Sequence, residues 1–228
     1  MRAHKTVILL TLGFLIGISV LLYPAFSNYW NSKTQSRAIV DYESVLEYLE
    51  PEDYSAIFQA AYDYNEALYK VEFPLRDYEE VPGYYDTLKI EGTKIIGYVK
   101  ISKIGVELPV YHGTSDMVLS RGVGHLEGTS LPVGGTNTNC VIAGHRGYSG
   151  AAFFRYVPEL KPGDEVIITN LWETMTYVVT DTKIIMPNEV DQILIQEGRD
   201  MITLLTCHPY ASGGKQRYLV FCDRVTTE

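Results

Sequence analysis

The feature that most constrains the fold is a succession of short apolar runs between residues 95 and 225. Runs rich in Val, Ile and Tyr, such as IIGYVKI, MTYVVTDTKII, MITLLT and RYLVFCDRV, are separated by turn signals such as KPGD. β-Branched and aromatic residues favour strands, and short strands at regular spacing indicate a β-barrel or a β-sandwich. We therefore predict a mostly β fold, interrupted by one helix near Glu189–Gly198.

A helical region precedes the strands. From Asn31 to about Lys70 apolar residues recur at three-and-four spacing, and Pro51 stands where a second helix begins. This pattern predicts two short helices. The following stretch, residues 71–93, mixes prolines, glycines and acidic residues, which is typical of a loop that crosses the surface of a domain.

An uncharged apolar run, Val7–Phe26, lies near the start of the chain and follows several basic residues. At about 1.5 Å of rise per residue, about 20 helical residues span a bilayer core of about 30 Å. The run therefore predicts a membrane anchor, with a cleaved signal peptide as the alternative because Ala25 and Ser27 suit a signal peptidase. Both interpretations place the following domain outside the cytoplasm, although Lys33 and Arg37 weaken the charge asymmetry across the run.

Composition sets the number of domains and the kind of partner. The chain has 228 residues, 46% of them hydrophobic, and a net charge of -9. This size suits one globular core with an appendage, and the acidic balance disfavours nucleic acid and anionic lipid surfaces as partners. We divide the chain into an anchor (1–30), a helical pair with a loop (31–90) and a β domain (91–228).

The last two predicted strands bring a thiol next to a guanidinium. If Leu204–Cys207 and Arg217–Phe221 are antiparallel neighbours, symmetry about the connecting loop pairs Cys207 with Arg217. Directly opposed residues share a face, with Cβ atoms about 4.5–5.5 Å apart. A nearby cation favours the thiolate form of a cysteine, and a guanidinium can also donate to an oxyanion.

The other cysteines are predicted to be core residues. The same register places Cys222 opposite Ile202, about 17 Å along the strand from Cys207 and too far for a disulfide. Three cysteines also cannot all pair. Cys207 is therefore predicted to be a free thiol, with Cys140 and Cys222 buried.

A nucleophilic thiol needs a partner for proton exchange, and His145 is the best candidate among the five histidines. It ends the apolar run CVIAGH and is followed by a turn, so its side chain is expected at the rim of the sheet. The chain order His, Cys, Arg differs from the order in papain-like proteases, where the cysteine comes first.

These residues resemble the sortases, cysteine transpeptidases of Gram-positive bacterial surfaces. The motif TLLTC with an arginine ten residues later, and IAGHR upstream, carry the resemblance, which covers about Gly97–Val225. The segments Leu108–Gly135 and GHRGYSGAAFF are similar to the class C branch, which assembles pili.

The resemblance implies a closed eight-stranded barrel with Cys207, His145 and Arg217 at one end of a groove. Cys207 would attack the Thr-Gly bond of an LPXTG-like sorting signal, His145 would protonate the leaving amine, and Arg217 would hold the substrate or the oxyanion. An amine, typically a lysine of another pilin, would resolve the acyl-enzyme. The resemblance implies a membrane enzyme with an extracellular catalytic domain and with neither a metal nor another cofactor.

Further residues are candidates for substrate contact or for a lid over the site. Class C sortases usually carry an Asp-Pro-aromatic lid, but none of the ten prolines here follows an aspartate. The lid-like segment, Glu72–Tyr85, occupies the equivalent place and offers Phe73, Asp77 and Tyr78. Thr206 and His208 flank the thiol, and strand alternation turns His208 away from the face of Cys207.

Other functions remain open at this stage. A sortase could attach surface proteins to a peptidoglycan cross-bridge, and a barrel could be a membrane-anchored binding module without activity. A cysteine L,D-transpeptidase lacks support because the Ser-His-Gly-Cys motif is absent. A zinc site built from Cys207, His208 and His145 lacks a close ligand pair with suitable spacing.

Overall fold

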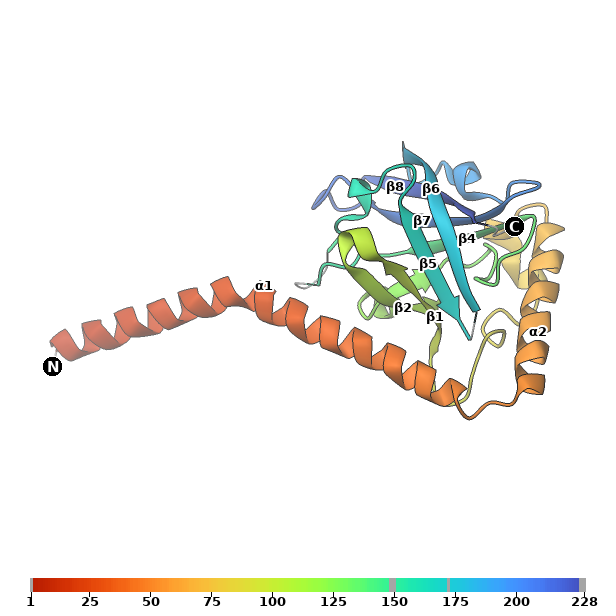
Figure 1. Ribbon diagram of the computed structural model, residues 1–228. Helices are drawn as coiled ribbons and strands as arrows, with labels where there is room; N and C mark the ends of the chain where they lie inside the picture. The colour runs from red at the N-terminus through yellow and green to blue at the C-terminus, as the bar shows by residue number, and fades with distance from the viewer. Residues whose placement is uncertain (1, 148–150, 172, 226–228) are drawn as a thin grey trace.

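The strands form a closed barrel in the computed structural model, which describes residues 2–147, 151–171 and 173–225 (Figure 1). Their order around the barrel is β1-β2-β3-β4-β7-β8-β6-β5. The strands are β1 (Ile95–Ile101), β2 (Val106–His112), β3 (Val123–His125), β4 (Thr138–Ala143), β5 (Glu165–Asn170), β6 (Glu173–Ile185), β7 (Asp200–His208) and β8 (Gln216–Arg224). Most pairs are antiparallel, but β2–β3 and β4–β7 are parallel. The predicted barrel is confirmed, and the sandwich is excluded.

Two long helices precede the barrel, and several short helices lie in the segments before and between its strands. They are α1 (Arg2–Leu46), α2 (Pro51–Tyr69), α3 (Pro74–Asp77), η1 (Tyr78–Glu80), η2 (Ser102–Ile104), α4 (Asp116–Leu119), η3 (Val157–Glu159) and η4 (Val190–Ile193).

Strand alternation divides the sheet into two apolar surfaces. Inside the barrel, Ile142, Leu204 and Val220 from adjacent strands are fully buried in the main core. On the outer face of the same strands, a second cluster contains Val141 and Leu219. Because both faces of β4, β7 and β8 are apolar, the outer face needs a cover, which the segments around α3 and η4 supply.

α1 is one continuous helix, so the prediction of a separate short helix beginning near residue 31 is wrong. Pro24 lies within it, and Figure 1 shows a bend between its projecting and its barrel-bound parts. A proline removes one helical hydrogen bond and bends the helix, but it need not end it. The expected boundary at residue 30 therefore falls inside a helix.

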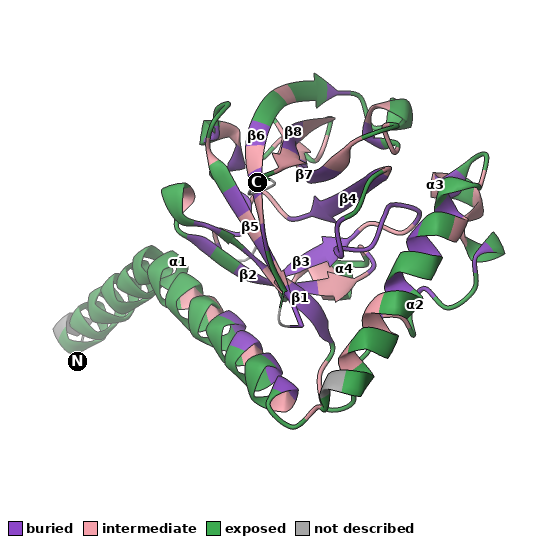
Figure 2. Ribbon diagram, turned by 45° about the vertical axis from the view of Figure 1, so that its right-hand side comes forward, coloured by how far each residue is buried: buried purple, intermediate pink, exposed green. Residues whose placement is uncertain are grey.

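The two parts of α1 have different surroundings. The first part is exposed, whereas Ile39, Tyr42 and Leu46 of the second part are buried against the barrel (Figure 2). An 18-residue window within His4–Leu46 has a mean hydropathy of 2.4, which makes this helix a candidate membrane span.

α2 is fixed to the barrel through a buried amide. Asn65 donates to the carbonyl of Leu131 at 3.2 Å and accepts from its backbone N–H at 2.7 Å. Tyr64 and Leu68 on the same helix are buried. These contacts hold the chain that leads into the lid-like segment.

The helix predicted near Glu189–Gly198 is reduced to the single turn η4. The buried Asn139 side chain donates to the carbonyls of Ile193 and Leu194 at 3.0 and 3.3 Å. These carbonyls bond across to β4, and Leu194 is extended (φ -67°, ψ 162°). The helical prediction is wrong because a tertiary contact competes with the local pattern.

Candidate active site

Cys207 and Arg217 lie opposite each other at the end of the β7–β8 pair. The register pairs Cys207 with Arg217 and Ile202 with Cys222, as the sequence predicts. Cys207 is a free, half-buried thiol, whereas Cys140 and Cys222 are free and buried. Burial raises the pKa of both buried thiols, so Cys207 is the cysteine placed to react.

Gly214 shows how close the thiol and the guanidinium are. Its carbonyl accepts a hydrogen bond of 2.6 Å from Nη1 of Arg217. A Cβ atom built on Gly214 would lie 3.5 Å from Sγ of Cys207 and 3.2 Å from Nη1 of Arg217. The sulfur and the guanidinium therefore border the same small space. Gly214 has φ +78°, a conformation that favours glycine.

His145 reaches the same rim from β4. The parallel register pairs Ala143 with Leu205, and Gly144 continues it by donating its N–H to the carbonyl of Leu205 at 3.0 Å. The hydroxyl of Thr206 donates back to the carbonyl of Gly144 at 2.8 Å. Continuing this register by one more residue places His145 level with Cys207, on strands about 4.8 Å apart.

The environment of His145 favours a neutral imidazole. The side chain is half-buried. Burial lowers its pKa, and the negative charge of Asp116 in α4 acts in the opposite direction. Asp116 is therefore an electrostatic partner that the sequence reasoning missed, because nothing local connects the two residues.

We predict that replacing Asp116 by Asn lowers the pKa of His145 further, since it removes the charge that stabilises the imidazolium. Titration of the His145 Cε1–H signal by NMR measures this shift. Glu165→Gln, which neutralises an exposed carboxylate on β5, is the matched control and should leave the signal unchanged. An unchanged pKa in Asp116→Asn would contradict this electrostatic picture.

Thr206 and His208 lie on the opposite face from Cys207. Thr206 is buried, so its side chain contacts the neighbouring strand and offers no exposed surface to a substrate. Nδ1 of His208 accepts a hydrogen bond of 3.0 Å from Nη1 of Arg146, and its ring lies beside the ring of Tyr218, with centroids 5.7 Å apart. The expected orientation of His208 is confirmed.

The lid-like segment packs on the outer face that carries Cys207. Leu75 of α3 joins the outer apolar cluster, as does Leu205, two residues before the thiol. The backbone of Pro74 passes so close to Gly128 that a Cβ there would lie 2.4 Å from the carbonyl oxygen of Pro74. Leu75 thus holds this segment over the sheet, and it is a residue that the sequence reasoning did not single out.

The predicted lid residues make contacts within their own region. Asp77 accepts two hydrogen bonds, of 2.7 and 2.6 Å, from Arg76, and these bonds lower the pKa of its carboxyl. Arg76 also lies over the ring of Phe73, 4.6 Å from its centroid. Tyr78 packs edge-on against Tyr84. No hydrogen bond joins Asp77 to Cys207 or Arg217 among the residues that the structure describes.

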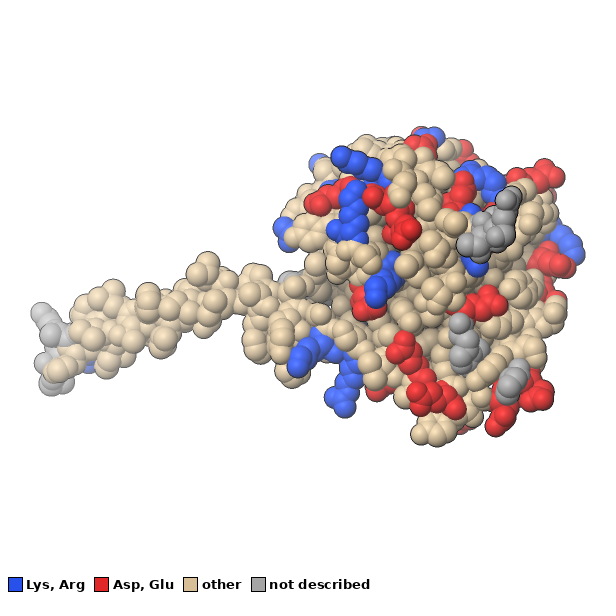
Figure 3. Space-filling view, in the orientation of Figure 1, with Lys and Arg blue, Asp and Glu red and all other residues tan. Residues whose placement is uncertain are grey.

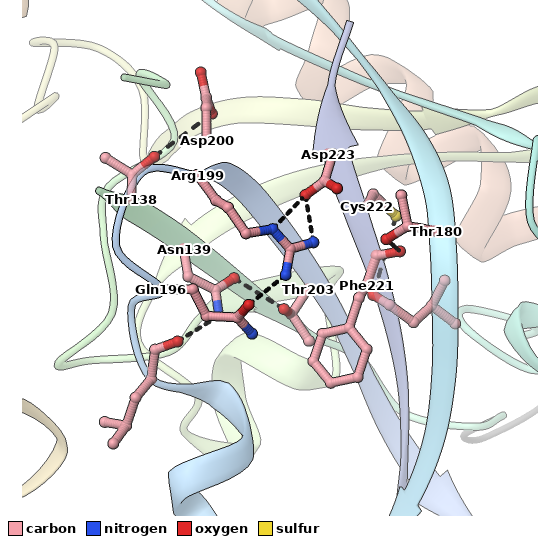
Figure 4. A network of polar contacts seen from close by, with 12 residues as sticks. Thr138, Asn139, Thr180, Gln196, Arg199, Asp200, Thr203, Phe221, Cys222 and Asp223 are labelled. Atoms are coloured by element: carbon pink, nitrogen blue, oxygen red, sulfur yellow. Dashed lines mark hydrogen bonds and ion pairs between the residues drawn. The ribbon is translucent and has the colours of Figure 1, made fainter. Parts of the chain in front are cut away.

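A polar network at the far end of β7 fixes the β6–β7 connection (Figure 4). Thr203 donates its hydroxyl to Oδ1 of Asn139 at 2.8 Å. Arg199 contacts Asp223 of β8 at 2.6 Å and also the side chain of Gln196. Because Ile193 of this connection packs in the outer cluster, the network holds the connection against the outer face of the sheet.

Replacing Asn139 by Ala should destabilise the chain by about 2 kcal/mol or more, because two carbonyls and the hydroxyl of Thr203 lose a buried partner. The urea midpoint of the chain in detergent micelles measures this loss. Glu197→Ala, an exposed change in the same connection, should stay within about 0.5 kcal/mol. Equal midpoints for both variants would show that the network is dispensable.

No cluster of three or more His, Cys, Asp and Glu side chains in the described part of the chain is suited to a metal ion. Of the segment GHRGYSGAAFF, residues 148–150 lie outside the described residues. The arrangement offers a thiol, an imidazole and a guanidinium at one rim, which together can form and release an acyl group.

Comparison with known proteins agrees with this arrangement. The family model described as the sortase domain matches residues 99–225. Sortase D of Bacillus subtilis (strain 168) is 32% identical over 142 residues, which cover 61% of this chain and 69% of that protein.

Solved structures extend the similarity beyond the barrel. The crystal structure of sortase C1 from Streptococcus agalactiae is 36% identical, with a TM-score of 0.78, and the match covers 84% of this chain and 100% of that one. The structure of Clostridium perfringens sortase C with the C-terminal cell wall sorting motif is 34% identical, with a TM-score of 0.74, over 84% of this chain and 100% of that one. Both structures are class C sortases.

Proposed function

The chain belongs to the sortase family of cysteine transpeptidases, and we propose that it cleaves an LPXTG-like sorting signal and transfers the cleaved protein to a lysine of a pilin. The observation that carries this proposal is the approach of Cys207 and Arg217 to the same space at Gly214, with His145 in register beside them.

In the first step, the neutral imidazole of His145 takes the proton of the Cys207 thiol, and the sulfur attacks the threonine carbonyl of the sorting signal. The C–N bond to the following glycine breaks, and the glycine amine leaves with a proton from His145. The product is a thioester between Cys207 and the threonine. The largely neutral imidazole expected for His145 is suited to passing a proton from one group to another.

Arg217 stabilises the negative charge that develops on the attacked oxygen. Its Nη1 donates to the carbonyls of Gly214 and Gln216, at 2.6 and 3.2 Å. These bonds fix the guanidinium in one orientation while its other N–H groups remain to serve the oxyanion. Donors that are fixed in advance lose little energy through reorganisation during the reaction.

In the second step, a neutral amine attacks the thioester and loses a proton to His145, the C–S bond breaks, and the sulfur takes up that proton, which restores Cys207. If the amine is a lysine side chain of another pilin, the product is an isopeptide-linked polymer. The class C structural relatives support this acceptor. The docked lid-like segment supports a site in which water competes poorly with the amine, because Leu75 covers part of the outer face.

The exposed apolar part of α1 is proposed to anchor the enzyme in the cell membrane with its barrel outside. This places the enzyme with substrates that pass through the same membrane. Its length and hydropathy support the proposal.

A ligation assay tests the acceptor. The purified full chain is incubated with an LPXTG-type peptide and an equal concentration of either a lysine-bearing pilin peptide or a peptidoglycan cross-bridge peptide. We expect the isopeptide product with the pilin peptide to form faster, as measured by mass spectrometry. Preferential ligation to the cross-bridge would reassign the enzyme to wall anchoring, and absence of either product would leave the binding-module alternative.

A further inference from the structure

Two adjoining pockets lie beside β2 and α4, and α1 borders one of them. Their volumes are about 320 and 210 Å³. Tyr111 of β2 and Arg121, just after α4, line both of them. The larger pocket is completed by α1, including Asn31, Thr34 and Gln35. The smaller one is lined also by Lys94 and His112.

The lining carries two basic side chains, and the carboxylates that act on His112, Asp86 and Glu127, lie outside it. The chain as a whole has 28 acidic and 19 basic residues, yet no Asp or Glu lines either pocket. The ion pairs of the described residues include neither Lys94 nor Arg121. Two cations that line one pocket without an ion-pair partner among the residues described repel each other, so an anion bound between them would relieve this repulsion.

His112 supplies a further polar group. Its Nε2 is buried and has no hydrogen-bond partner among the described residues. A buried polar atom without a partner costs free energy, which a ligand at that point can recover. A guanidinium, an ammonium and an imidazole that share one lining are the donors that proteins use for phosphate oxygens.

The position on α1 indicates where the phosphate comes from. Asn31 follows the end of the apolar run, Phe26, by about 7 Å along the helix, and Gln35 by about 13 Å. The headgroup layer extends about 5–7 Å beyond each side of the hydrocarbon core, within reach of long side chains at this level. Gln35 also donates to the backbone carbonyl of Arg121 at 3.4 Å, which joins the helix to the basic side chain.

The distribution of charged side chains on the surface agrees with a basic site near this part of α1. Lys and Arg side chains lie along α1 where its projecting part meets the domain, and Asp and Glu side chains are more frequent on the opposite side (Figure 3). Lys33 and Arg37 are exposed on this part of α1.

We propose that the two pockets bind the phosphate headgroup of an anionic membrane lipid through Arg121, Lys94 and His112. The bound headgroup orients the barrel relative to the bilayer. This inference rests on the proposed membrane anchoring by α1. The overall charge of -9 disfavours general attraction to an anionic surface, so the contact depends on this local site.

Native mass spectrometry of the full chain tests the proposal. The protein is released from non-ionic detergent micelles after addition of phosphatidylglycerol, phosphatidylcholine or inorganic phosphate at equal concentrations. We expect one phosphatidylglycerol molecule to be retained at least about tenfold more strongly than phosphatidylcholine, and inorganic phosphate to compete weakly. Arg121→Gln and Lys94→Gln should each weaken retention by about tenfold, the effect of losing one charge-assisted contact.

Lys161→Gln is the matched control, because it removes an exposed lysine far along the chain from the pockets, and it should leave retention unchanged. Thermal unfolding monitored by circular dichroism shows whether each variant is folded. If Arg121→Gln does not fold, the retention measured for Lys94→Gln tests the proposal. Equal retention in all variants, or retention of inorganic phosphate alone, would overturn the lipid site. Peptide ligation in micelles should persist in Lys94→Gln, so failure of the lipid site is distinguishable from failure of the transpeptidase function.

Discussion

Replacing Cys207 by Ala should lower the rate of peptide ligation by about 10⁴-fold or more, because no other group at the rim can form the thioester. The rate of product formation from an LPXTG-type peptide and a lysine-bearing acceptor measures the loss. The substitution should leave the fold intact, since the side chain of Cys207 is half-exposed and makes no hydrogen bond among the described contacts.

Cys222→Ala provides the comparison at another cysteine. That thiol is buried in the barrel core, and its loss should reduce stability while folded protein keeps its ligation rate. If Cys207→Ala retained more than a small fraction of the wild-type rate, the nucleophile would have to be another residue.

The second large effect is expected at His145. His145→Asn should slow ligation by about 10²–10⁴-fold, the range for loss of a general acid–base group. A substrate whose leaving group is a thiolate needs no proton from the enzyme, so its reaction with Cys207 should suffer at least about tenfold less. Parallel rate measurements with the amide and the thioester substrate test this difference.

The control for His145→Asn is His208→Asn, which changes the histidine next to the nucleophile on the other face of β7. We expect this control to affect the amide and the thioester substrate to the same extent. Equal losses for both substrates in His145→Asn would argue against proton donation and for a structural role of the imidazole.

Strand-level features of the site could be predicted from the sequence. The pairing of Cys207 with Arg217 follows from the symmetry of two apolar runs about one loop, and the structure has this register. Alternation likewise gives the opposite orientation of His208. These predictions succeed because strand pairing and alternation depend on local periodicity.

Features that arise from contacts between distant segments could not be predicted in this way. Asn139 lies 54 residues before Ile193 in the chain, and its amide removes the helix that the local pattern favours. The effect of the Asp116 charge on the pKa of His145 and the packing of Leu75 on the outer face also depend on contacts between distant segments. The continuity of α1 was not predicted, because the composition changes from apolar to polar after Phe26 although the helix continues to Leu46.

The position of the lid-like segment could be predicted from the sequence, but the residue that packs it on the barrel could not. The sequence places it correctly as a surface segment before the barrel, and its aromatic and acidic residues are the natural candidates for a lid. In the structure, the residue that packs on the outer face is the aliphatic Leu75, while Asp77 and Phe73 both contact Arg76. An aliphatic side chain in a short turn gives no sequence signal of this role.

The central claim is that one sulfur at the rim of the barrel carries the acyl group between the two steps. Intact-mass spectrometry of the full chain with an LPXTG-type peptide, in the absence of an amine acceptor, tests it most directly. We predict a single adduct with the mass of the peptide acylated through its threonine, mapped to Cys207 by proteolysis and released by hydroxylamine. An adduct at any other residue, or none under conditions where the peptide is cleaved, would contradict the claim.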